Sequence, residues 1–125
     1  MIDTHAHLDF PDLKKDLSAV LERAVARGVS AIVSVGIDEK SSSQAVVNAA
    51  KIPWIWVAVG VHPHEAARVT SAFPRSLKEL ALLPGVVAIG EMGLDYYRDH
   101  SPRDIQRQIF RAQIDVAHEV NKPVI

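Results

Sequence analysis

Cysteine is absent from this sequence of 125 residues, so the chain can form neither a disulfide bond nor a thiolate metal site, and it has no thiolate nucleophile. Such a composition suits a reducing compartment, and we expect a cytoplasmic protein. Long hydrophobic runs are also missing, because the longest apolar stretch, residues 52–61, contains a proline and is too short to cross a membrane. No secretory leader is expected, since Asp3 and two histidines closely follow Met1. We therefore predict no membrane partner.

An excess of charge of one sign is missing as well. The chain has 14 Lys and Arg against 15 Asp and Glu, and no basic block stands out. A protein of this kind can handle a phosphate backbone only through a local site, not through bulk charge. The hydrophobic share of 48% excludes a disordered chain and fits one globular domain with a core.

Strand-like and helix-like segments alternate along the chain. Apolar runs predict strands at residues 1–5, 31–35, 54–59 and 86–89, with the start of a fifth at 124–125. Helical spacing of apolar residues predicts helices between them, at residues 11–25, 41–50, 74–83 and 102–120. Such alternation, with right-handed crossovers, forms a parallel sheet. The fold class is therefore α/β.

Particular residues predict the helix ends and the environment of one strand. We expect Ser41–Ser43 to cap the second helix and Ser101 to cap the last one, with Pro102 at its first position. The continuous apolar run at residues 54–59 is typical of a strand covered on both faces.

His5 and His7 stand two residues apart at the end of the first predicted strand. Side chains two apart on an extended backbone point to the same side, so both imidazoles can bind one metal ion. Asp3 is placed to orient one of these rings as a hydrogen-bond acceptor, or to face the interior side of the sheet. Taken alone, such a pair is more often part of a polar surface loop.

Glu91 follows the fourth predicted strand directly, after Gly90. The carboxyl ends of parallel strands are where α/β proteins bind ligands, so we consider Glu91 a catalytic or metal-ligating residue. The glycine allows the backbone to approach a neighbour closely. A solvated loop glutamate is the competing interpretation.

Further polar residues follow the third and fourth strands. His62 is a candidate to contact a substrate phosphate or transfer a proton, whereas His64 is expected in a water-facing turn. Asp95 and Tyr96 are candidates to line a substrate pocket, although the tyrosine is equally compatible with packing of the loop. His100 is expected to be structural or solvated.

Three polar clusters thus fall at the carboxyl ends of three strands, and they would share one rim of a parallel sheet. Carboxylate and imidazole ligands together form an open site for a divalent metal ion. Such an ion activates water and offsets charge on a phosphoryl or carbonyl oxygen.

The motifs DTHAHLD (residues 3–9), GVHPH (60–64) and GEMGLDYY (90–97) resemble, in order and spacing, those of the TatD family of metal-dependent deoxyribonucleases. The long last helix and the KPVI segment at 122–125 are similar to that family too. The resemblance covers the whole chain. The His-x-His pair alone would also fit the wider group of metal-dependent amidohydrolases.

The resemblance implies the N-terminal half of a (β/α)8 TIM barrel over residues 1–125, truncated at the start of the fifth strand. It implies one or two divalent ions (Mg²⁺, Mn²⁺ or Zn²⁺), with His5 and His7 binding one and Glu91 bridging two. His62 would lie on the substrate side. DNA, including single-stranded DNA, would be the substrate, and further metal ligands would come from later strands.

Two other functions remain open at this point. A related barrel hydrolyses amides or esters, because the same kind of site polarises a carbonyl group. Alternatively, the chain is a catalytically inactive half-barrel, which would self-associate through its open sheet edges.

Overall fold

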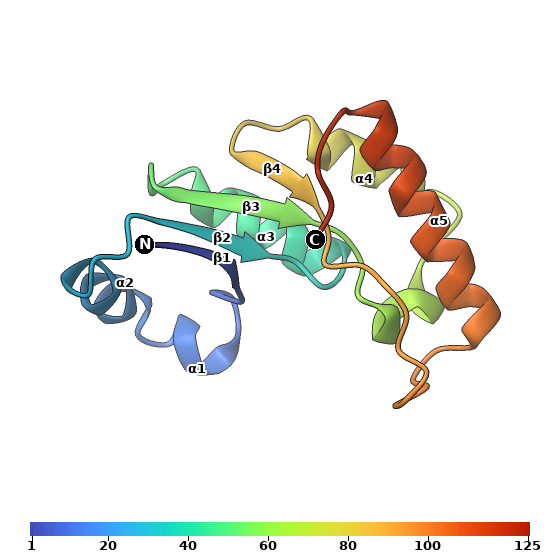
Figure 1. Cartoon of the computed structure of the whole chain (residues 1–125), viewed down its shortest axis with the longest axis horizontal. Helices are drawn as coiled ribbons and strands as arrows, with labels where there is room; N and C mark the ends of the chain where they lie inside the picture. Colours follow the sequence, from blue (N-terminus) through green and yellow to red (C-terminus); the bar gives the residue numbers. More distant parts are fainter.

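A computed structural model describes all residues, 1–125. Its centre is a four-stranded parallel sheet in which neighbours in sequence are neighbours in space. The strands are β1 (Ile2–Ala6), β2 (Ala31–Val35), β3 (Ile55–Val59) and β4 (Val86–Ile89). All four arrowheads point to one end of the sheet, where the C-terminus also lies (Figure 1). The four strands confirm the predicted ones, and each begins and ends within about one residue of its predicted bounds.

Helices connect the strands. They are α1 (Pro11–Lys14), α2 (Leu17–Ala26), α3 (Glu39–Ala49), the 3₁₀ helix η1 (Pro63–Arg68), α4 (Phe73–Ala81) and α5 (Arg103–Glu119). The last three α-helices lie along one side of the curved sheet (Figure 1). The main core fills the space between them and the strands, with Val57, Val59, Phe73, Leu77 and Ile89 almost fully buried. This is the predicted N-terminal half of a (β/α)8 barrel.

After α5 the chain returns to the sheet. Val124 forms a parallel bridge with Ile89 of β4, and the Ile125 amide donates to the Ile89 carbonyl oxygen at 2.9 Å. The predicted start of a fifth strand is therefore present beside β4.

Three local predictions were wrong. The first helix is two helices, because the chain breaks at Asp16, which has an extended φ of −139°. Asp38, not the serines after it, caps α3: its carboxylate accepts from the Ser41 amide while the Ser41 hydroxyl accepts from the Asp38 amide. Ser101 caps no helix, because its buried hydroxyl instead donates to the His64 carbonyl oxygen at 2.8 Å and Pro102 occupies the cap position.

The expectation that residues 54–59 are covered on both faces holds only at the end of the strand, where Ala58 is buried on the second face. Helices cover one face, where Ile55 and Val57 are buried, but the Trp56 side chain between them is 41% exposed. The opposite face holds only a small cluster that includes Val35 and Ala58. No helix in the structure combines the length and apolar character that crossing a bilayer requires.

Candidate metal centre

His5, His7 and Glu91 meet at the carboxyl end of the sheet. His5 Nε2 lies 3.0 Å from Glu91 Oε2, and His7 Nε2 lies 3.4 Å from the same oxygen. One ligand atom from each residue lies within 4.8 Å of the other two. Residues 86 positions apart in the sequence are thus brought together by the parallel topology.

A backbone contact orients one of the two histidines. His7 Nδ1 lies 3.0 Å from the Val35 carbonyl oxygen, so this nitrogen carries the proton and Nε2 presents its lone pair to the cluster. Of the two roles predicted for Asp3, the orientation of a histidine ring is not seen. The Asp3 carboxylate accepts from the backbone amide of His5 at 3.1 Å and contacts neither ring. It therefore fixes the end of β1 rather than a ring tautomer.

Glu91 is held where β4 leaves the sheet. Its amide donates to the Gly36 carbonyl oxygen at 3.1 Å, which ties it to the end of β2. The preceding Gly90 has a φ of +146°, and a Cβ there would overlap the Ile125 carbonyl oxygen. Glycine is therefore required beside the carboxylate, as its place in the sequence suggested.

His62 lies on the other side of the same carboxylate. Its Nε2 is 3.6 Å from Glu91 Oε1, while its Nδ1 accepts from the His64 amide at 3.1 Å. This acceptor role places the ring proton on Nε2, facing Glu91. Burial lowers the pKa of His62, and the negative charge of Glu91 opposes that shift only in part. His62 is therefore a neutral hydrogen-bond donor at neutral pH.

His64 and Asp95 form a pair that the sequence reasoning missed. His64 Nε2 lies 2.5 Å from Asp95 Oδ2, so the prediction that His64 faces water was wrong. Asp95 Oδ1 accepts from the amides of Arg98 and Tyr97 at 2.9 and 3.0 Å. These contacts, the Arg98 amide first and His64 next, hold the pKa of Asp95 well below its usual range.

The pair joins two loops of the rim. One loop carries His62 and the other carries Glu91, so the His64–Asp95 contact fixes the distance between them. The ring of His100 packs edge-on against His64 at 4.5 Å, which agrees with its expected structural role. The sequence did contain a signal for the His64–Asp95 pair, because both residues follow strands whose carboxyl ends share the rim.

Replacing Asp95 with asparagine is expected to lower the thermal midpoint of unfolding at pH 7. A carboxyl whose folded pKa is depressed stabilises the fold above its unfolded pKa of about 4, and that contribution is lost as the pH falls below it. The difference between the two proteins should therefore stay constant above about pH 5 and shrink below about pH 4. Thermal melts from pH 3 to 8 measure this.

Asp115→Asn, at an exposed site on α5, is the matched control. Its thermal midpoint should change with pH in the same way as that of the wild type. If the difference in thermal midpoint between the wild type and Asp95→Asn did not change with pH, this role for the carboxylate would be contradicted.

Tyr96 lies away from the three-residue cluster. Its ring stacks under the guanidinium of Arg103 at 4.8 Å, and Arg107 donates to its hydroxyl at 3.3 Å. The structure therefore places this predicted substrate residue against α5. Asp95, which was also predicted to line a substrate pocket, forms the pair with His64 described above.

Two buried glutamines of α5 also support the rim, and the sequence reasoning assigned no supporting role to either of them. Gln106 accepts from the Asp95 amide at 2.8 Å and donates to the Asp95 carbonyl oxygen at 3.1 Å. Gln113 makes the same two-way contact with the backbone of Val61, at 2.8 and 3.0 Å. Their places on the buried side of a predicted amphipathic helix were the available signal.

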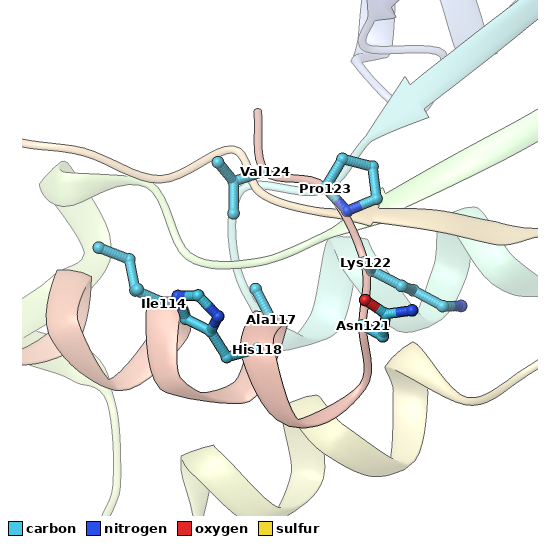
Figure 2. Close-up of a pocket in the computed structure, with 7 residues that line it drawn as sticks. All are labelled: Ile114, Ala117, His118, Asn121, Lys122, Pro123 and Val124. Carbon is cyan, nitrogen blue, oxygen red and sulfur yellow. The ribbon is translucent and has the colours of Figure 1, made fainter.

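A cavity of about 350 Å³ lies elsewhere, between α5 and the segment that follows it. Figure 2 shows His118 and Ile114 on the helix side and Val124 on the strand side. None of the predicted site residues lines it, and it has no carboxylate. It is therefore separate from the cluster at the rim.

The cluster fits a divalent metal ion in both chemistry and spacing. An ion with bonds of about 2.1 Å holds neighbouring ligand atoms about 3.0–3.5 Å apart. The two distances from Glu91 Oε2 to the histidine nitrogens, 3.0 and 3.4 Å, match that spacing. Imidazole and carboxylate are ligands that divalent transition metals accept.

Fold and site together define a (β/α)8-type half-barrel with a polar cluster at its carboxyl-end rim. The sequence model of the family described as "TatD related DNase" matches residues 2–125. The chain belongs to this family.

Relatives and solved structures agree with this assignment. The chain is 46% identical over 125 residues to "Uncharacterized metal-dependent hydrolase YabD" of Bacillus subtilis, covering 100% of this chain and 49% of the relative. It is 38% identical over 124 residues to "3'-5' ssDNA/RNA exonuclease TatD" of Escherichia fergusonii, covering 99% and 48%. The crystal structure of YJJV, a TatD homolog from Escherichia coli, superposes with a TM-score of 0.92 at 28% identity, covering 99% and 49%. The chain thus spans about half the length of the curated relatives it matches.

Proposed function

We propose that residues 1–125 form one half of a metal-dependent phosphodiesterase that cleaves DNA. The observation that carries this proposal is the convergence of His5 and His7 on one oxygen of Glu91. Family membership supports the hydrolytic chemistry. The name of the Escherichia fergusonii relative, an exonuclease of single-stranded DNA and RNA, supports single-stranded DNA as the substrate.

Each residue of the cluster has a distinct role in this proposal. His5, His7 and Glu91 would hold a divalent metal ion, which when bound would activate water and offset negative charge on a phosphoryl oxygen. The second oxygen of Glu91 lies 3.6 Å from His62 Nε2 and is not shared with His5 or His7, so it would be available to a second ion if one binds. Whether Mg²⁺, Mn²⁺ or Zn²⁺ is bound is one outcome of the experiment below.

His62 is proposed to bind the substrate. Its neutral ring presents an N–H on the Glu91 side of the rim, where it can donate to a phosphate oxygen. Asp95 positions the loop that carries His62 through its contact with His64. We propose a supporting role for Tyr96, whose stacking on Arg103 fixes the end of the loop that carries Glu91 and Asp95.

The remaining metal ligands are proposed to come from a second half of the barrel, since the relatives are about twice as long. A covalently continuous second half is the arrangement that the relatives support. Pairing of two copies of this half through their open sheet edges is the other arrangement, which the solution mass of the purified chain distinguishes.

The test is metal-dependent cleavage of a labelled single-stranded oligonucleotide. Two proteins are assayed: the 125-residue chain, and a chimera in which it replaces the matching half of the Escherichia fergusonii relative. Reactions contain Mg²⁺, Mn²⁺, Zn²⁺ or a chelator. We expect the chimera to cleave with metal, and to lose cleavage with chelator or with His5→Ala, which also reveals contaminating nuclease.

A folded chimera that cleaves amide or ester substrates but no DNA would contradict the proposal. So would a His5→Ala chimera that retains full nuclease activity.

A further inference from the structure

A cavity of about 340 Å³ opens beside His7, between the segment that follows β1 and the start of α3. Its lining includes Asp9, Phe10, Lys14, Lys40 and Gln44. The volume lies at the lower end of the range typical of small-molecule sites. None of these residues belongs to the metal cluster, so the cavity needs an explanation of its own.

Phe10 connects the cavity to the metal centre. Its ring stacks on the His7 imidazole with a centroid distance of 4.6 Å and an interplanar angle of 14°. Although one face is covered in this way, the residue remains 42% exposed. An exposed aromatic ring is a stacking surface that any nucleobase can use.

Two unpaired cations lie at the same cavity. The lysines that form ion pairs in the structure are Lys15 and Lys78, so Lys14 and Lys40 are without a carboxylate partner. Both are exposed, one on α1 and the other on α3. Their charges are free to bind a phosphate group.

Two acidic residues, Asp9 and Asp38, also line the cavity. The Oδ1 atom of Asp9 is buried and has no hydrogen-bond partner in the chain, which is uncommon for a buried polar atom. Asp38, the second acid of the cavity, is already engaged by the Ser41 amide as the cap of α3. Because Asp9 Oδ1 is closed to solvent, it is out of reach of a molecule in the cavity, and Asp9 contributes to the cavity wall only.

We propose that this cavity binds the nucleotide next to the cleaved bond in single-stranded DNA. The base stacks on Phe10, and its phosphate lies between Lys14 and Lys40. The inference rests on the proposed function, because the metal centre, whose His7 contacts Phe10, defines where the DNA strand is cut. The cavity acts in binding and takes no part in bond cleavage.

Binding is tested with the 125-residue chain and a fluorescein-labelled ten-nucleotide oligothymidylate, in chelator, so that no cleavage occurs. Fluorescence anisotropy gives Kd. Phe10→Ala and Phe10→Leu should each weaken binding about tenfold, since they remove the stacking surface. The leucine variant retains apolar volume and guards against loss of the fold. Tyr97→Leu, at a 93% exposed aromatic outside the cavity, is the matched control and should leave Kd unchanged.

The lysines give an independent measurement. Lys14→Ala and Lys40→Ala should each reduce the slope of log K against log salt by about 0.7, because each variant neutralises one phosphate fewer. Lys51→Ala, at an exposed lysine outside the cavity, should leave the slope unchanged. Backbone NMR shifts of the wild-type chain on addition of the oligonucleotide should include Phe10, Lys40 and Gln44.

Unchanged Kd and salt slope in the cavity variants would overturn the inference, as would equal losses in the control variants. This failure is distinct from failure of the proposed function. An oligonucleotide that binds the cavity but is never cleaved in the presence of metal would refute the nuclease and leave the binding site standing.

Discussion

Glu91→Gln is expected to weaken divalent metal binding by at least about 100-fold, because the loss of even an outer partner of a metal ligand costs about 10–100-fold. His5 and His7 both direct a nitrogen to Glu91 Oε2, at 3.0 and 3.4 Å. The carboxamide of glutamine is neutral, so it does not attract a cation as the carboxylate does. One of its two terminal groups is also an N–H₂ group, which cannot act as a metal ligand. Calorimetric titration of the 125-residue chain with Zn²⁺ or Mn²⁺ measures the effect, and in the active chimera turnover should disappear.

Glu79→Gln is the matched control, since Glu79 is exposed on α4 and forms no ion pair. It should bind metal like the wild type. His5→Ala should reproduce the loss seen with Glu91→Gln, because both remove a ligand of the same ion. Wild-type affinity in Glu91→Gln would mean that metal binds elsewhere, and the proposed centre would be wrong.

The sheet was predictable from the sequence because its strands are short apolar runs separated by polar segments. The apolar runs at residues 31–35 and 86–89 coincide with β2 and β4. The first residues of the helices were harder to predict from the sequence. Several polar residues near residue 40 are suited to cap α3, and only the folded backbone shows that Asp38 accepts the Ser41 amide. The exposure of Trp56 was unpredictable for another reason: the apolar run does not reveal that helices cover one face of the sheet.

The cluster of His5, His7 and Glu91 was predictable from topology, because each follows a strand and parallel strands end at one edge. Which side chains within a loop meet is a different question. His64 and Asp95 are 31 positions apart, and their contact depends on the conformations of two loops. Tyr96 lies next to Asp95 in sequence yet points to α5. Loop conformation depends on backbone hydrogen bonds that a residue pattern does not specify.

Gln113→Leu is expected to lower the free energy of unfolding by about 2–4 kcal/mol, since an unsatisfied buried polar group costs about 1–3 kcal/mol. The Gln113 side chain is 1% exposed and satisfies both the amide and the carbonyl of Val61, at 2.8 and 3.0 Å. Leucine has a similar volume but no hydrogen-bonding atom, so both backbone groups lose their partner. Urea unfolding followed by circular dichroism measures the difference.

The position of Gln113 makes this effect relevant to the site. Gly60 permits the close approach, because a Cβ there would lie 2.8 Å from Gln113 Oε1. Val61 directly precedes His62, so loosening this backbone should also broaden the NMR signals of the His62 ring. Gln108→Leu, on the exposed side of the same helix, should change stability by less than about 0.5 kcal/mol. If the two variants were equally stable, water would have to satisfy Val61, and α5 would not be what fixes the loop of His62.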